Sequence, residues 1–180
     1  MPATHIALLR GINVGTAKRV AMSDLRALVE GLGGSDVRTL LNSGNVVFSV
    51  TNDRSDLAAE IEAALVKKTG VSARVTVITA AELAAVVKKN PLLQVADDPA
   101  RFLISFFNRP GDAKALKALA KQDWSPEALA VGPRAAYLWC ANGILESPLW
   151  TAVGKALGDG VTSRNWATVL KLHALASAPS

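Results

Sequence analysis

The sequence predicts an α+β fold with two sheets of antiparallel strands, and three observations support this prediction. Half of the 180 residues are hydrophobic, which is enough to bury a core and excludes a disordered chain. Strands and helices follow one another in the first half in the order β-α-β-β-α-β, and the second half partly repeats that order. At roughly 100–200 residues per domain, the length fits one domain or two small subdomains.

A long polar loop joins the first predicted strand to the first predicted helix. Ile6 to Leu9 is a short apolar run that indicates a buried strand. The loop covers Arg10 to Arg19, and Ser23-Asp24 then predicts a helix start with a cap and an acidic first turn. Leucine and valine recur at helical spacing until Gly33-Gly34 ends the helix.

A hairpin follows this helix. Val37 to Leu41 and Val46 to Val50 are two β-rich runs, and Asn42-Ser43-Gly44-Asn45 between them is typical of a tight turn. We therefore expect two adjacent antiparallel strands here.

A second helix and a further strand complete the first half. The helix begins at Asp53 or Ser55 and ends at Gly70, and Ala73 to Ile78 is a strand rich in Val and Thr. The resulting order is the split β-α-β, or ferredoxin-like, arrangement.

The second half is expected to form a related unit with one strand fewer. Thr79 to Glu82 is a capping box that opens a helix, which Pro91 stops. The remaining expected elements are a strand at Arg101–Phe107, a helix at Asp112–Lys121, hairpin strands at Ala128–Val131 and Tyr137–Cys140, a helix from Ser147-Pro148 to Leu157, and a last helix capped by Thr162-Ser163. We therefore expect a ferredoxin-like subdomain over residues 1–79, a helix and linker over 80–100, and a second plait-like subdomain with C-terminal helices over 101–180.

Several classes of protein are excluded by composition. The longest uninterrupted apolar run is Ala135 to Ala141, far short of the roughly 18–20 residues that a membrane-spanning helix needs. Cys140 is the only cysteine, so neither an intramolecular disulfide nor a cysteine-based zinc site can form. The segment Met1 to His5 lacks the pattern of a signal peptide. We expect a cytoplasmic protein without cofactor or metal, and the sequence leaves its oligomeric state open.

Topology predicts that two polar segments lie together at one end of the first sheet. The two strands of a β-α-β crossover are parallel, so the loop after the first strand and the hairpin after the second leave the same end. Arg10, Lys18 and Arg19 add three positive charges with no acidic residue before Asp24, and the loop precedes a helix N-terminus, whose dipole favours anions. A small anionic ligand suits this end. The alternative is that the glycines only form turns and that the cations are solvated.

A second polar segment lies near the C-terminus. A hydroxyl cap, a guanidinium and an amide in Thr162-Ser163-Arg164-Asn165-Trp166 would lie within one helical turn and could present donors to an anion. The alternative is ordinary capping, with Trp166 anchoring the helix in the core. The candidate ligand-binding residues from both segments are Arg10, Gly11, Asn13, Val14, Gly15, Lys18, Ser43, Gly44, Asn45, Ser163, Arg164 and Asn165.

No set of catalytic residues stands out, so the sequence leaves open whether the protein is an enzyme. Gly11 to Gly15 matches neither a phosphate-binding P-loop nor the dinucleotide fingerprint. Cys140 lies in an apolar run, typical of a buried residue, and the two histidines, His5 and His173, form no metal-binding pattern. Asp97-Asp98 before Pro99 indicates a surface turn.

The formal charge of +5 raises nucleic-acid binding as a rival hypothesis. Ferredoxin-like RNA-binding modules stack bases on aromatic residues of their central strands, and here those strands supply only Phe48. Contact with a nucleic-acid backbone through the basic loop stays open and would depend strongly on salt. A further alternative is a structural or oligomer-forming protein in which the motifs have no ligand.

Four segments together resemble one family, the bacterial family called domain of unknown function 1697. They are Ile6 to Gly15, Leu25 to Leu28, Asn42 to Phe48, and Ser163 to Leu172. The resemblance implies two plait-like α+β subdomains and no established activity. It also implies that the recurrent motifs fall on the loop, the hairpin and the Arg164-Asn165-Trp166 segment. Members of the family often carry a lysine at the position of Pro148, so this chain lacks any ligand contact that such a lysine would make.

Overall fold

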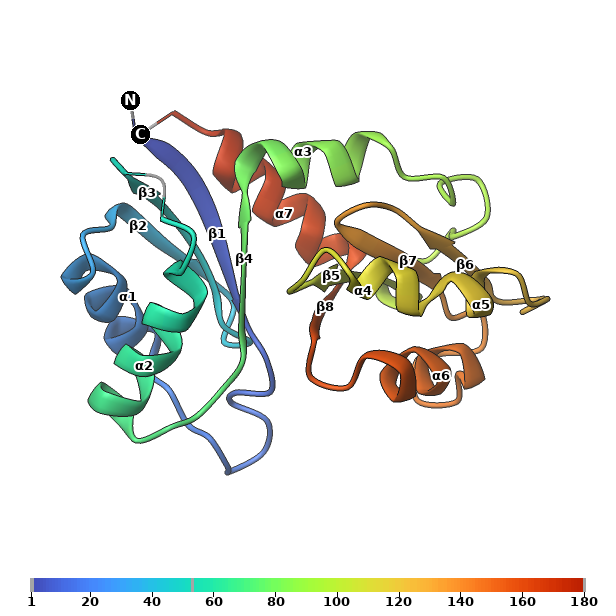
Figure 1. The fold of residues 1–180 in the computed structure, drawn as a ribbon, viewed down its shortest axis with the longest axis horizontal. Helices are drawn as coiled ribbons and strands as arrows, with labels where there is room; N and C mark the ends of the chain where they lie inside the picture. Colours follow the sequence, from blue (N-terminus) through green and yellow to red (C-terminus); the bar gives the residue numbers. More distant parts are fainter. Residues whose placement is uncertain (1, 53, 180) are drawn as a thin grey trace. The chain divides into compact units, whose positions relative to one another are not determined.

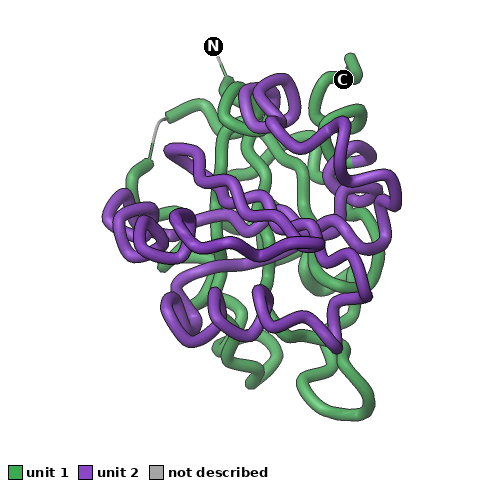
Figure 2. The backbone as a smooth tube through the Cα atoms, turned by 90° about the vertical axis from the view of Figure 1, so that its right-hand side faces the viewer, with its two compact units in different colours: residues 1–83, 172–180 green, residues 84–171 purple. Residues whose placement is uncertain are grey.

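The computed structural model describes residues 2–52 and 54–179. The chain divides into two compact units (Figure 2). Unit 1 comprises Met1–Leu83 and Leu172–Ser180, and unit 2 comprises Ala84–Lys171. In the described ranges no helix has the length and apolar character that crossing a membrane requires.

Unit 1 contains a four-stranded antiparallel sheet in the order β2-β3-β1-β4. Its strands are β1 (Ala3–Leu9), β2 (Ser35–Leu40), β3 (Asn45–Val50) and β4 (Val75–Thr79), and its helices include α1 (Met22–Gly31) and α2 (Leu57–Thr69). The two helices lie on the same side of the sheet (Figure 1). Their buried residues Leu25, Ile61 and Leu65 pack with strand residues such as Leu9 and Phe48 in one core. The predicted order β-α-β-β-α-β is confirmed.

The direction of the strands fixes where the loops of unit 1 meet. β1 pairs antiparallel with β3, and β3 pairs antiparallel with β2, so β1 and β2 run in the same direction. The loop after β1 and the hairpin after β2 therefore leave the same end of the sheet, as the crossover topology predicts.

Unit 2 contains a second four-stranded antiparallel sheet, in the order β6-β7-β5-β8. Its strands are β5 (Phe102–Phe107), β6 (Ala128–Val131), β7 (Ala135–Trp139) and β8 (Val161–Asn165), and its helices include α4 (Asp112–Ala115), α5 (Lys117–Ala120) and α6 (Pro148–Leu157). Phe107, Leu138 and Val153 belong to its core. Helices α3 (Ala80–Lys88) and α7 (Trp166–Ser177) each contribute residues to both units. Two ferredoxin-like subdomains are thus confirmed as the fold class.

The prediction that the second unit lacks a strand is wrong, because the expected helix cap at Thr162-Ser163 lies in strand β8. Thr162 pairs with Phe106 and Ser163 with Ser105 on β5. The Ser105 and Ser163 hydroxyl groups are 2.7 Å apart and hydrogen-bonded. This bond satisfies polar side chains that would otherwise disfavour a strand, and α7 begins only at Trp166.

Two smaller predictions about helices are also wrong. Ser23 does not cap α1, whose N-cap is Ala21 without a side-chain hydrogen bond. The single helix expected over Asp112–Lys121 is divided into α4 and α5, with the fully buried Leu116 between them. The possible start of the second helix at Asp53 lies outside the described residues.

The other cap predictions are confirmed. The amide of Thr79 donates to the Glu82 carboxylate at 2.8 Å, and the amide of Glu82 donates to the Thr79 hydroxyl at 3.1 Å. At α6 the Ser147 hydroxyl accepts the Trp150 amide at 2.9 Å, with Pro148 at the first helical position. Gly70 ends α2 with a φ of +74°.

Candidate functional site

The β1–α1 loop folds into a small exposed hairpin. Val14 and Ala17 form an isolated antiparallel bridge, and the Asn13 amide donates to the Lys18 carbonyl at 3.0 Å. Gly15, at the turn, has a φ of +61°, and Asn13 and Lys18 on either side have φ values of +55° and +52°. Asparagine tolerates this region better than lysine, so the paired hairpin holds Lys18 in a disfavoured conformation. Val14 is 70% exposed.

Asn13 joins this loop to the hairpin that follows β2. Its Nδ2 donates to the Val20 carbonyl at 2.9 Å and to the Asn42 carbonyl at 2.8 Å. Its Oδ1 accepts the Val20 amide at 2.8 Å. The predicted convergence of the two polar segments is therefore confirmed, but the Asn13 carboxamide already has these partners and acts to position the loop.

The β2–β3 hairpin is held against the same loop by close packing. The Leu9 amide donates to the Gly44 carbonyl at 2.9 Å. A Cβ atom on Gly44 would lie 2.8 Å from side-chain atoms of both Leu9 and Ile12, so the position needs glycine for space as well as for its φ of +89°. Asn45 is fully buried and donates to the Leu40 carbonyl at 2.8 Å and to the Ser43 hydroxyl at 2.9 Å. Ser43 and Asn45 therefore shape the turn from inside.

A surface pocket of about 310 Å³ opens where the loop, the hairpin and the start of α1 meet. Its lining residues are Asn13, Arg19, Val20, Ala21, Met22 and Asn42. The first helical hydrogen bond of α1 runs from the Leu25 amide to the Ala21 carbonyl, so the amides of residues 22–24 precede it. Ala21 offers no side-chain cap to those amides. Positive partial charge therefore gathers on one wall of the pocket, beside the exposed Arg19 side chain.

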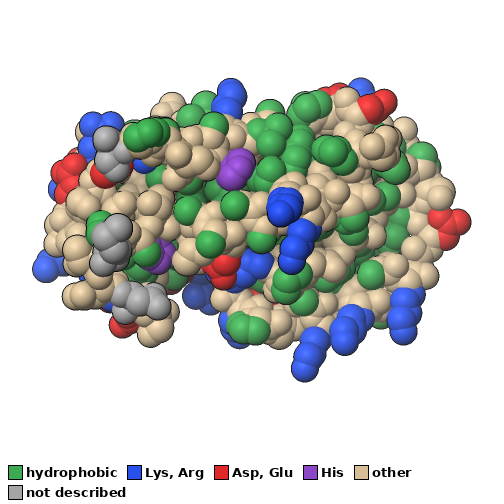
Figure 3. All heavy atoms as spheres, turned by 90° about the horizontal axis from the view of Figure 1, so that it is seen from above, with side chains coloured by type: hydrophobic (Ala, Val, Ile, Leu, Met, Phe, Trp, Pro, Cys, Tyr) green, Lys and Arg blue, Asp and Glu red, His purple; other side chains and the backbone are tan. Residues whose placement is uncertain are grey.

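Further charges lie at this end of the sheet. The Arg10 amide donates to the Arg74 carbonyl at 2.9 Å, which places two arginines on neighbouring strand ends. Glu62 lies 3.7 Å from the Arg74 guanidinium and also accepts the Val75 amide at 2.9 Å. Asp24 is the acidic residue in the first turn of α1. Figure 3 shows Lys and Arg side chains at several separate places on the visible face.

The C-terminal candidate residues lie in unit 2 and have structural roles. Arg164 donates through Nη1 to the Ser163 carbonyl at 2.9 Å, and burial lowers the pKa of its guanidinium to about 10. Asn165 caps α7, because its Oδ1 accepts the Thr168 amide at 2.9 Å. Trp166 packs against Phe102 with ring centroids 5.4 Å apart. The expectation of a helical turn presenting these donors is wrong, and joint binding of a ligand by Arg10 and Arg164 stays a prediction.

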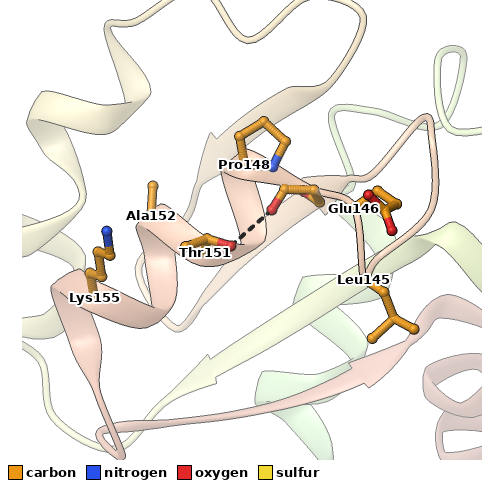
Figure 4. A pocket seen from close by; sticks show the side chains of 7 residues that line it. Leu145, Glu146, Pro148, Thr151, Ala152 and Lys155 are labelled. Atoms are coloured by element: carbon orange, nitrogen blue, oxygen red, sulfur yellow. Dashed lines mark hydrogen bonds between the residues drawn. The ribbon is translucent and has the colours of Figure 1, made fainter.

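Unit 2 has an open pocket of its own, of about 670 Å³, along α6 and the segment before it (Figure 4). Leu145, Glu146, Ser147, Pro148, Thr151, Ala152 and Lys155 line it. The Thr151 hydroxyl is engaged with the Ser147 carbonyl at 3.2 Å, and Leu145 is 96% exposed. One carboxylate and one ammonium group give this pocket no net charge, so it offers less to an anion than the loop pocket does.

The cysteine and one of the two histidines are buried. Burial raises the pKa of the Cys140 thiol, which is fully inaccessible to solvent, so its nucleophilic form is disfavoured. His5 is buried, stacks on Phe48 and contacts the Ala3 carbonyl through Nδ1 at 3.0 Å. Among the described residues no group of three or more His, Cys, Asp or Glu side chains could hold a metal ion.

The central strands of unit 1 do not present a base-stacking surface. Ile6, Ala7, Leu8 and Leu9 of β1 are aliphatic and fully buried, and Ala7 and Leu9 share one core with Phe48. Phe48 on β3 is 1% exposed. RNA binding of the kind that stacks bases on these strands therefore has no structural support.

Comparison with known proteins places this fold in a family. The sequence profile described as "Protein of unknown function (DUF1697)" matches residues 3–137. The chain belongs to the DUF1697 family. Among solved structures, the conserved bacterial protein SP0830 from Streptococcus pneumoniae is similar, with a TM-score of 0.74 and 20% sequence identity over 98% of this chain and 100% of that one. Comparison with curated proteins found no match.

In this DUF1697 protein the predicted loop and hairpin lie together, but of the twelve predicted ligand-binding residues only Asn13 lines the pocket between them. The other lining residues, outside that predicted set, are Arg19, Val20, Ala21, Met22 and Asn42. The positive charge of Arg19 was an available signal. Asn42 belongs to the hairpin turn that the sequence predicts beside the loop, whereas nothing in the sequence marks Met22.

Proposed function

We propose that this protein binds a small anionic, phosphorylated ligand in the loop pocket of unit 1. The observation that carries the proposal is the pocket of about 310 Å³ whose wall combines Arg19 with the uncapped start of α1. Free backbone amides at a helix start together with a guanidinium group are a common way to bind phosphate. The single cysteine supports the cytoplasm as its compartment.

Roles follow from the geometry. Arg19 supplies charge and hydrogen bonds, and the Met22 amide at the start of α1 supplies a further donor. Asn13 positions the loop through its three hydrogen bonds. Asp24 in the first turn of α1 opposes an anion, so its charge sets an upper limit on affinity.

Calorimetric titration with ribose 5-phosphate and with inorganic phosphate tests the proposal. Arg19→Ala is expected to weaken binding about 10- to 100-fold, which is the range for losing one charge-assisted hydrogen bond. Arg26→Ala is the matched control, because Arg26 is an exposed arginine on the nearby helix α1 that does not line the pocket. Asp24→Asn is expected to strengthen binding.

Two results would contradict the proposal. One is that neither phosphate compound binds the wild-type protein. The other is that Arg19→Ala and Arg26→Ala weaken binding equally, which would indicate attraction by overall charge and no built site.

A further inference from the structure

The loop pocket is larger than an inorganic anion needs. Its volume of about 310 Å³ lies at the lower end of the range of about 300–1,000 Å³ that small-molecule sites occupy. The anion contacts described above use only the wall formed by Arg19 and the start of α1. The Asn42 side chain and the apolar side chains of the lining therefore face another part of the ligand, and their chemistry indicates what that part is.

Asn42 provides a polar side chain in the pocket wall, and its backbone is held in place by a hydrogen bond. Its carbonyl accepts the Asn13 Nδ2 hydrogen bond at 2.8 Å, which ties the residue to the loop. Its exposed side chain lines the pocket, and no described residue forms a hydrogen bond with that carboxamide. A carboxamide offers one donor and one acceptor side by side, which matches the donor and acceptor edge of a purine such as adenine.

The same segment that offers its backbone amides to the anion also presents apolar side chains, those of Val20, Ala21 and Met22. Val20 is 4% exposed and belongs to the core, and Met22 packs against that core while remaining partly exposed. A thioether adapts to flat rings and makes favourable contacts with aromatic systems. An apolar surface beside a carboxamide is suited to a planar ring that carries hydrogen-bonding groups on its edge.

We propose, on the basis of the function proposed above, that the ligand of the loop pocket is a nucleoside monophosphate. Its phosphate contacts Arg19 and the start of α1, its base lies against Met22, and the Asn42 carboxamide binds the edge of the base. Asn42 thereby determines specificity for the base, and Arg19 determines affinity for the phosphate.

The test compares adenosine 5′-monophosphate with ribose 5-phosphate, which lacks only the base. For the wild type we expect at least about 10-fold tighter binding of the nucleotide, the effect of one good bidentate contact to a base. Asn42→Ala is expected to remove most of that difference while leaving the affinity for ribose 5-phosphate unchanged. Asn52→Ala, at an exposed asparagine that does not line the pocket, is the matched control.

The outcomes separate the two proposals. Equal binding of both compounds would overturn the inference about the base and leave the anion site standing. Binding of neither compound would overturn both. A short single-stranded oligonucleotide, titrated at two salt concentrations, completes the design. If it binds more tightly than the nucleotide and loses affinity steeply with salt, the ligand is a nucleic-acid chain and the inference of a free nucleotide is wrong.

Discussion

Replacing Gly44 by alanine tests how the hairpin and the loop are held together. Gly44 has a φ of +89°, a conformation that costs an L-residue about 1–2 kcal/mol. The added Cβ would lie 2.8 Å from the Leu9 Cβ and from the Ile12 Cδ1, whereas carbon atoms in contact prefer about 3.5–4.0 Å. Leu9 and Ile12 are 0% and 2% exposed and cannot move away freely. Overpacking of this kind costs a further about 1–3 kcal/mol.

We therefore expect Gly44→Ala to lower the free energy of unfolding by about 2–5 kcal/mol, a large share of the about 5–15 kcal/mol typical of folded proteins. Urea unfolding followed by far-ultraviolet circular dichroism is the appropriate assay, because all four tryptophans lie in unit 2 and their fluorescence reports on that unit. The affinity of the loop pocket should fall as well, since Gly44 packs on Ile12, the residue before Asn13.

Gly15→Ala is the control for the backbone cost alone. Gly15 also has a positive φ, of +61°, but nothing lies within 4 Å of a Cβ added there. It should lose only the about 1–2 kcal/mol of the disfavoured conformation. If Gly44→Ala and Gly15→Ala proved equally stable, the close packing of the hairpin on the loop would not contribute, and the reasoning would be refuted.

Three further predictions concern single side chains. Tyr137 is the only tyrosine, and burial raises its pKa above the ordinary value of 10.0, so an ultraviolet titration of tyrosinate should have a midpoint above that of free tyrosine. Above pH 10 the folded protein therefore keeps a proton that the unfolded chain has lost, and the free energy of unfolding should fall as the pH rises. Glu127→Ala should cost about 1–3 kcal/mol in urea unfolding, because an α6 amide loses its 3.1 Å bond to the buried carboxylate, whereas Glu127→Gln keeps that acceptor; equal losses would contradict this role. Asn13→Ala should free the loop and speed tryptic cleavage after Lys18 and Arg19, measured by mass spectrometry, and unchanged cleavage would show that the Asn13 hydrogen bonds do not hold the loop.

Local sequence signals were sufficient to predict the ends of several helices. The capping box of Thr79 and Glu82, the Ser147-Pro148 start of α6 and the Gly70 end of α2 are each fixed by hydrogen bonds or backbone preferences within a few residues. The sequence also placed the loop after β1 beside the hairpin after β2, because the crossover topology leaves no other arrangement for those two ends.

Strand β8 shows where local signals fail. Thr162-Ser163 before a long helical pattern resembles a helix cap, and the true cap, Asn165, comes two residues later. The segment forms a strand because it pairs along the edge of β5. The Ser105 and Ser163 hydroxyl groups, 58 residues apart in the chain, are hydrogen-bonded across this pair. Arg164 is likewise polar in sequence and mostly buried in the fold, where loss of solvent lowers its pKa to about 10.

The sequence by itself determined the order of elements in unit 1, most helix ends and the position of the basic loop, because capping, turn formation and apolar periodicity act over a few residues. Only the tertiary structure decided which of the candidate side chains are available to a ligand. Asn13, Asn42 and Asn45 are all asparagines in predicted loops or turns, and the sequence does not distinguish their side chains. In the structure the Asn13 carboxamide donates to the Val20 carbonyl and the Asn45 carboxamide donates to the Leu40 carbonyl. A further Asn13 bond, to the Asn42 carbonyl, joins segments 29 residues apart, so the pocket that Asn42 and Arg19 line is a property of the packed chain.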